Sequence, residues 1–123
     1  MPRPHKYGVS APDARTWLWK CYASKAEMEY AQRIARLQPC AFVREQPRIK
    51  LGPVKVYVPD FYIEGKDGGF FVDVKGVETP AFKEAKRFWR EYGPGELHVV
   101  KKKGKNWHTT DVVPGADAAP SQA

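Results

Sequence analysis

The alternation of apolar and polar residues changes its period several times along the chain. A period of two predicts five β-strands, over residues 16–22, 42–51, 54–64, 69–75 and 96–101. Apolar residues at helical spacing over 25–38 and 80–92 predict two α-helices. The expected order is therefore β-α-β-β-β-α-β, an α/β fold in which helices flank a mixed β-sheet.

Both predicted helices carry start signals. Ser24 is a predicted N-cap, and Glu27, three residues later, completes a capping box. Thr79 and Pro80 form an N-cap and a first-position proline. Because Glu27 lies one turn before Tyr30, its carboxylate is expected on or beside the inward face of the first helix. The predicted buried stripes are Tyr30, Ile34 and Leu37 in the first helix, and Phe82, Ala85, Trp89 and Tyr92 in the second.

A glycine-flanked Lys66–Asp67 pair between two predicted strands indicates a hairpin turn. If the hairpin folds about this pair, Asp60 lies directly across from Asp73. Side chains on a strand alternate between its faces, so Asp73 and Lys75 share one face, and Asp60 would join them. A change of register by one residue would separate these groups. The sequence thus predicts a charged cluster on two hydrophobic strands, conditional on the register.

Composition and charge limit the classes of protein. Of 123 residues, 42% are hydrophobic, which favours a folded domain, here assigned to residues 1–113. We expect residues 1–14 to form a flexible or wrapping arm, and residues 114–123 a disordered tail. The surplus of 21 Lys and Arg over 14 Asp and Glu favours a polyanionic partner. With no membrane-length apolar run and no signal-peptide core, we expect no membrane partner and a cytoplasmic location.

Two carboxylates and an ammonium follow the apolar strands, where their burial is costly unless they are paired or hold a cation. Asp60, Asp73 and the main-chain carbonyl of Val74 are the oxygen ligands that Mg²⁺ or Mn²⁺ prefers. Glu27 would reach the same point from its helix, directly or through a water. Lys75 would orient an attacking water or stabilise charge on a phosphate. The cluster therefore predicts hydrolysis of a phosphodiester.

Basic residues elsewhere in the chain would hold the phosphates that flank the cleaved bond. They are Lys83, Lys86, Arg87, Arg90, Lys101, Lys102 and Lys103. Simpler interpretations stay open for all of these groups. The helical residues also suit a solvated face, the lysine run also suits a flexible loop, and Asp73 and Lys75 also suit a surface ion pair. Glu27 also suits a capping residue bonded to Ser24.

Pro59-Asp60 followed by Asp73-Val74-Lys75, with Ser24-Lys25-Ala26-Glu27 on a preceding helix, resembles the signature of the PD-(D/E)XK nucleases. The resemblance is closest to small phage-encoded members and covers roughly residues 6–100. It implies a restriction-endonuclease-like fold and catalytic roles for Glu27, Asp60, Asp73 and Lys75. It also implies that Ser24 and Gln46 line the site. Many relatives have Glu where this chain has Asp73, and the shorter side chain would shift a bound metal.

The resemblance further implies a Mg²⁺-dependent, structure-selective DNA endonuclease, and in particular a Holliday junction resolvase. Such an enzyme makes paired symmetric nicks in a four-way junction, which implies a homodimer with two active sites. A phage or prophage protein acting in the host cytoplasm is expected. A flap, nicking or restriction-type endonuclease is a near alternative. A non-catalytic nucleic-acid-binding module with an eroded nuclease core, or a basic RNA-binding scaffold, is an alternative of another class.

Overall fold

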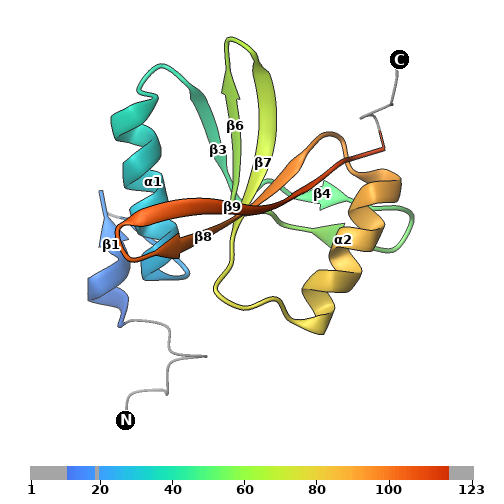
Figure 1. The fold of residues 1–123 in the computed structure, drawn as a ribbon, viewed down its shortest axis with the longest axis horizontal. Helices are drawn as coiled ribbons and strands as arrows, with labels where there is room; N and C mark the ends of the chain where they lie inside the picture. The colour runs from blue at the N-terminus through green and yellow to red at the C-terminus, as the bar shows by residue number, and fades with distance from the viewer. Residues whose placement is uncertain (1–10, 19, 117–123) are drawn as a thin grey trace. The chain divides into compact units, whose positions relative to one another are not determined.

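The computed structural model describes residues 11–18 and 20–116, which fall into two compact units divided between Pro39 and Cys40 (Figure 1). The assignment of residues 1–113 to one domain stays a prediction. Of the predicted arm, residues 1–10 lie outside the described part of the chain, and Pro12–Arg15 forms a 3₁₀-helix, η2. In the described residues, no helix has the length and apolar character needed to cross a membrane.

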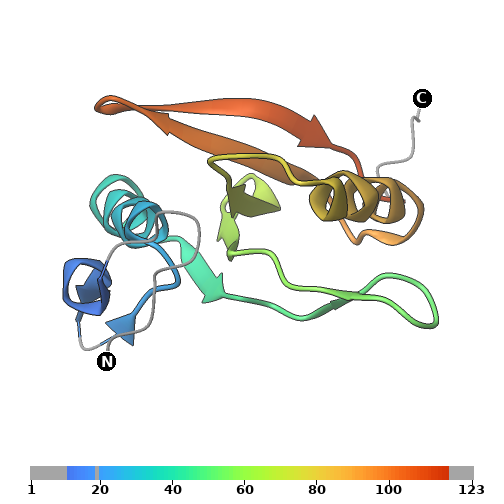
Figure 2. The same ribbon diagram turned by 90° about the horizontal axis from the view of Figure 1, so that it is seen from below.

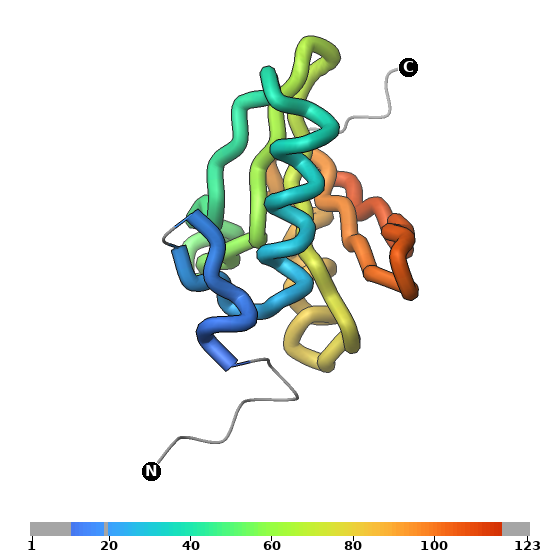
Figure 3. Tube along the Cα trace, turned by 90° about the vertical axis from the view of Figure 1, so that its left-hand side faces the viewer, coloured from blue at the N-terminus to red at the C-terminus, as the bar shows by residue number. Residues whose placement is uncertain are grey.

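The N-terminal unit contains a small hairpin and the first helix, the blue to blue-green segments of the trace in Figure 3. Its elements after η2 are β1 (Thr16–Trp17), β2 (Lys20–Cys21) and α1 (Lys25–Leu37). The prediction of one strand over 16–22 is wrong, because β1 and β2 pair antiparallel and Leu18 between them has a φ of 51°. Helix α1 begins after Ser24, as predicted, and buries Tyr30 and Ile34. Leu37, the last residue of the helix, is instead 55% exposed.

The C-terminal unit is built on a five-stranded mixed sheet in the order β3-β6-β7-β8-β9. Strands β7 and β8 are parallel and are joined by helix α2, whereas the other neighbours in the sheet are antiparallel. The prediction of a mixed sheet with two helices in an α/β chain is therefore confirmed. The elements of the unit are β3 (Phe42–Glu45), β4 (Ile49–Lys50), β5 (Val56–Tyr57), β6 (Phe61–Gly65), β7 (Gly68–Val74), α2 (Pro80–Tyr92), β8 (Leu97–Lys103) and β9 (Asn106–Val113).

The two strands predicted over 42–51 and 54–64 are each interrupted. Their first and last parts, β3 and β6, belong to the large sheet, whereas β4 and β5 form a separate two-stranded sheet. Gln46, at the interruption, has a φ of 52°, and the buried prolines Pro47 and Pro59 cannot donate to a ladder. The antiparallel register nevertheless continues, since the Gln46 N–H donates to the Asp60 carbonyl at 2.9 Å. Asp60 therefore lies directly before Phe61, the first residue of β6.

Strand β9 is absent from the predicted element order. The strand predicted over 96–101 extends to Lys103, and the chain then turns through Gly104 and Lys105 into β9. Gly104 has a φ of 64°, a conformation that glycine adopts without strain. After β9, the Ala116 N–H donates to the Gly93 carbonyl at 2.9 Å, so residues 114–116, assigned above to the tail, lie against the end of α2.

Helix α2 packs against the sheet through a core centred on Trp89 (Figure 2). The Trp89 ring is fully buried, lies edge-on to Phe71 with centroids 5.2 Å apart, and donates from Nε1 to the Gly95 carbonyl at 2.7 Å. Phe82 and Ala85 are buried on the same helix, as predicted, but Tyr92 is 45% exposed. Because side chains alternate along β7, Asp73 lies on the same sheet face as Phe71, the face that α2 covers. The remaining core residues are Leu51, Leu97 and Val113.

Candidate functional site

Asp60 and Asp73 meet where β6 begins and β7 ends. The Asp60 N–H donates to Oδ1 of Asp73 at 3.2 Å, and the Val74 N–H donates to Oδ2 of Asp60 at 2.7 Å. The β6–β7 register pairs Phe61 with Val72 and closes over a two-residue turn. The predicted hairpin about Lys66–Asp67, with Asp60 across from Asp73, is therefore confirmed.

The Asp73 carboxyl group is buried, with 1% of the residue exposed. Burial raises the pKa of Asp73 above its ordinary value, against the attraction of Lys75 and the hydrogen bonds from Tyr57 and Asp60. The Tyr57 hydroxyl donates to Oδ2 of Asp73. Burial, and next the negative charge of Asp73, also raise the pKa of Tyr57, so the phenol keeps its proton and stays a donor. The site therefore holds a carboxylate whose charge is only partly compensated by the protein.

Tyr57 is the site residue that sequence reasoning missed. In the Val54–Val58 segment the alternation favours burial of the valines, but Val56 and Val58 are 47% and 38% exposed. Tyr57 points inward instead, with its ring centroid 6.3 Å from that of Phe82. A tyrosine in an apolar setting usually finds a hydrogen-bond partner, and the predicted pairing of Asp60, close to Tyr57 in the sequence, with Asp73 was the available signal.

Lys75 follows directly after β7 and lies on the same side as Asp73. Its backbone N–H donates to the Val100 carbonyl at 2.9 Å, which fixes the chain beside β8. Its ammonium nitrogen lies 4.5 Å from the centroid of the Phe82 ring. The structure thus brings Asp60, Asp73 and Lys75 together, with the Val74 main chain between the last two. Gln46 joins them through its backbone contact with Asp60, and its side chain is exposed.

Glu27 and Ser24 belong to the N-terminal unit, whereas the two aspartates belong to the C-terminal unit, so the roles expected of Glu27 and Ser24 beside the aspartates stay predictions. Ser24 is the N-cap of α1, and its Oγ accepts from the Glu27 N–H at 3.1 Å. The same hydroxyl donates to Oε2 of Glu27 at 3.3 Å. These contacts are those expected of a helix cap, the alternative interpretation of this glutamate.

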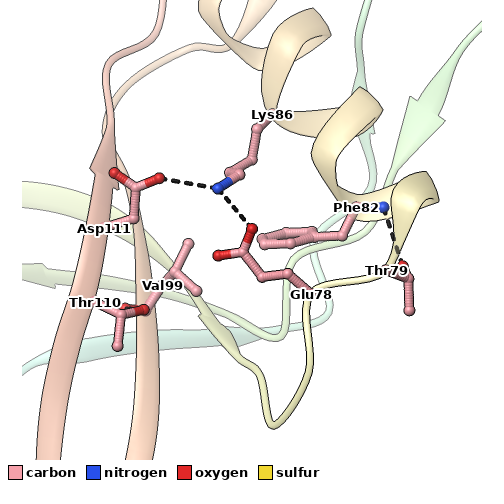
Figure 4. A network of polar contacts seen from close by, with 7 residues as sticks. All are labelled: Glu78, Thr79, Phe82, Lys86, Val99, Thr110 and Asp111. Carbon is pink, nitrogen blue, oxygen red and sulfur yellow. Dashed lines mark hydrogen bonds and ion pairs between the residues drawn. The ribbon is translucent and has the colours of Figure 1, made fainter.

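Lys86 forms a second polar cluster between α2, β9 and the segment after Lys75 (Figure 4). Its ammonium lies 2.8 Å from Oε1 of Glu78 and 3.0 Å from Oδ2 of Asp111, and its side chain is only 12% exposed. The Glu78 contact is the largest cause of a raised pKa at Lys86. The predicted phosphate contact at Lys86 would have to displace these carboxylates. The other three basic residues predicted on this helix, Lys83, Arg87 and Arg90, are exposed.

We expect Lys86→Met to lower the free energy of unfolding by about 1–3 kcal/mol, because it leaves two neighbouring carboxylates without their shared cation. Lys83→Met on the same helix, where the side chain is exposed, should change it by less than about 0.5 kcal/mol. Urea denaturation of both variants measures the difference. Equal stability of the two would show that the Lys86 contacts contribute nothing to the fold.

The donor set suits a hard divalent cation. Asp60 and Asp73 could supply two carboxylates and Val74 a backbone carbonyl, and water would have to complete the shell of a Mg²⁺ ion. Within the described ranges, no three His, Cys, Asp or Glu side chains form a metal-binding group. Such an arrangement can hold one phosphate oxygen and one water close to a lysine. The chain matches no family model, no curated protein and no solved structure.

Proposed function

We propose that this protein is a Mg²⁺-dependent endonuclease that cuts DNA at branched structures, with a restriction-endonuclease-like core. The observation that carries the proposal is the meeting of Asp60 and Asp73 on adjacent strands, with Lys75 two residues beyond Asp73. This is the order and strand context of the PD-(D/E)XK signature described above. A surface ion pair does not account for it, because Asp73 is 1% exposed and its charge is buried.

In this proposal Asp60, Asp73 and the Val74 carbonyl would hold the metal. Bound Mg²⁺ would lower the pKa of a coordinated water and polarise the phosphodiester. A buried carboxylate with a raised pKa gains more from a cation than an exposed one does, because the cation replaces lost solvation. Mn²⁺ is expected to substitute, since it takes the same oxygen ligands.

The residues of the chain have separate roles at the phosphate. Tyr57 holds Oδ2 of Asp73 and so fixes the orientation of that carboxylate. Lys75, whose ammonium lies 4.5 Å from the centroid of the Phe82 ring, would turn that ammonium to the attacking water or to the charge on the phosphate. Gln46 would line the site. Lys83, Arg87 and Arg90, with Lys101, Lys102 and Lys103, would contact flanking phosphates.

The choice of a Holliday junction as substrate rests on the family resemblance, as does a homodimer that places two sites on one junction. A specific observation favours a second candidate, a non-catalytic nucleic-acid-binding module. Both aspartates already have protein partners, since Asp60 accepts from Val74 and Asp73 accepts from Tyr57 and Asp60. In an eroded site such contacts would replace the metal permanently.

The test is an assay of labelled four-way junction, replication flap, nicked duplex and linear duplex with Mg²⁺, with EDTA as control. We expect Mg²⁺-dependent cleavage of the junction, with paired nicks placed symmetrically across the branch. Cutting that favours the flap or the nicked duplex would replace the resolvase by another structure-selective nuclease. Binding of DNA without metal-dependent cleavage of any substrate would establish the non-catalytic module and overturn the proposal.

A further inference from the structure

The β8–β9 hairpin extends beyond the large sheet as a two-stranded ribbon. Pairing of β7 with β8 ends at Val74 and Val100, whereas β8 and β9 continue to pair out to Lys103 and Asn106. We call residues 101–109 the ribbon. At the usual rise of a strand, its three residue pairs reach roughly 10 Å beyond the sheet. In Figures 1 and 2 the ribbon points away from α2.

The ribbon is strongly basic. Residues 101–110 contain four lysines and no Asp or Glu. Lys101, Lys103 and Lys105 are exposed, whereas Lys102 is half-buried and lies opposite Trp107 in the register. A ribbon with this charge suits a polyanion better than a neutral partner. It also lacks the exposed apolar tip that would insert into a lipid surface, because Gly104 and Lys105 form its turn.

The lysines on the two faces of the ribbon are not equivalent. Asp73 lies in register with Val99 on the parallel neighbour, so the two side chains share one face of the sheet. Lys101 and Lys103 continue the alternation of Val99 and lie on that same face, whereas Lys102 lies on the opposite one. A nucleic-acid strand that reaches Asp73 and Lys75 would therefore continue over Lys101 and Lys103.

The root of the ribbon is held rigidly. The β8–β9 pairing shifts between Val99 and Val100, where Thr110 forms a bulge and its Oγ1 donates to the Val99 carbonyl at 3.2 Å. Bulges increase local twist and redirect the strands beyond them. One residue further, Asp111 is tied to Lys86 of α2 (Figure 4). The direction of the ribbon relative to β7 is thereby fixed by the fold, as a docking element requires.

We infer that the ribbon docks into the major groove of a duplex DNA arm next to the cleaved phosphodiester, with Lys101 and Lys103 on its phosphates. The inference rests on the proposed function, which supplies the assumption that DNA is cleaved at Asp73. A two-stranded ribbon fits the major groove of B-form DNA, about 12 Å wide, but not the deep, narrow major groove of A-form RNA. Lysine contacts to phosphate carry no sequence information, so the ribbon recognises duplex arms of any sequence.

The test measures binding of the full chain to labelled duplex DNA by fluorescence anisotropy in EDTA, where no metal-dependent cleavage occurs. We expect Lys101→Ala/Lys103→Ala to weaken binding about tenfold or more and to reduce the slope of log affinity against log salt by about 2 units between about 50 and 200 mM. The charge-matched control Lys50→Ala/Lys66→Ala, at exposed sites of the same unit, should leave both the affinity and the slope within about twofold.

Lys101→Arg/Lys103→Arg should bind as the wild type does, because it keeps both charges; its binding confirms that the ribbon still folds. Equal losses of DNA affinity in Lys101→Ala/Lys103→Ala and in Lys50→Ala/Lys66→Ala would overturn the inference, because they would mean a general effect of charge. Equal affinity for duplex RNA, or comparable binding to anionic vesicles, would also overturn it. Ribbon-dependent binding without Mg²⁺-dependent cleavage would support the ribbon and reject the nuclease. Unchanged cleavage and unchanged DNA affinity in Lys101→Ala/Lys103→Ala would support the nuclease and reject the docking role of the ribbon.

Discussion

Asp73→Asn is expected to reduce Mg²⁺-dependent DNA cleavage about 10³-fold while raising the melting temperature of the metal-free protein. Activity falls because an amide replaces a carboxylate ligand and no longer offsets the charge of the metal. The expected loss is comparable to that of removing a group that stabilises transition-state charge, about 10²–10³-fold or more. Junction cleavage under single-turnover conditions measures it, with binding to the junction in EDTA as a check on substrate affinity.

Stability should rise in the same variant because the charge lost is one that the fold buries. The Asn side chain can keep both contacts, with Oδ1 accepting from the Asp60 N–H and Nδ2 donating to the Tyr57 oxygen. Substitutions that relieve such a site commonly add about 0.5–2 kcal/mol. Asp67→Asn, at an exposed turn of the same hairpin, should alter neither activity nor melting temperature. A lower melting temperature for Asp73→Asn would mean that the buried carboxylate of Asp73 stabilises the fold and does not cost it stability.

Lys75→Met is expected to reduce cleavage by about 10²–10⁴-fold, with little change in DNA affinity. The Met side chain keeps the length and the apolar character of the Lys75 stem but removes the ammonium, which lies 4.5 Å from the centroid of the Phe82 ring and which the proposal assigns to the water or the phosphate. A large fall in kcat at nearly constant KM is the signature of a group that acts in the transition state. Lys66→Met, on the exposed turn, is the matched control. A rise in KM alone would make Lys75 a phosphate-binding residue.

Lys75→Met should lower the melting temperature, whereas Asp73→Asn should raise it. Lys75 attracts the Asp73 charge and partly offsets the effect of burial on the pKa of Asp73. Without Lys75 the ionised carboxylate loses compensation, so the melting temperature at neutral pH should fall. Adding Asp73→Asn to Lys75→Met should restore it, because the charge that needed Lys75 is gone. Additive shifts in the double variant would show that the two residues do not interact.

Local sequence signals predicted the part of the site that depends on one hairpin. The glycine-flanked Lys66–Asp67 turn sets the register, and the register places Asp60 against Asp73. Helix starts at Ser24 and Thr79 were also predicted, because a cap is read from a few adjacent residues. These features need no knowledge of how distant segments pack.

Features that depend on distant segments were missed. Tyr57 faces inward because Phe82 and Trp89 of α2 lie beside it, and the alternation of the local segment favoured the valines. The Lys86 contacts needed Asp111, which lies on a strand that the element order omitted. The interruption at Gln46 and Pro59 follows from where the chain passes from one sheet to another, which local propensity does not specify.

The parallel pairing of β7 with β8 has a consequence for the order in which the C-terminal unit assembles. The β6–β7 hairpin closes over two residues, so the Asp60 and Asp73 pair can form early and locally. Strand β8 can join only after α2 has crossed over, which is a contact of long sequence separation and a slower event. During synthesis the two carboxylates would therefore leave the ribosome and accept their hydrogen bonds from the Asp60 and Val74 N–H groups before the ribbon exists. A nascent chain would thus hold the Asp60 and Asp73 pair before it has the ribbon that we infer binds DNA.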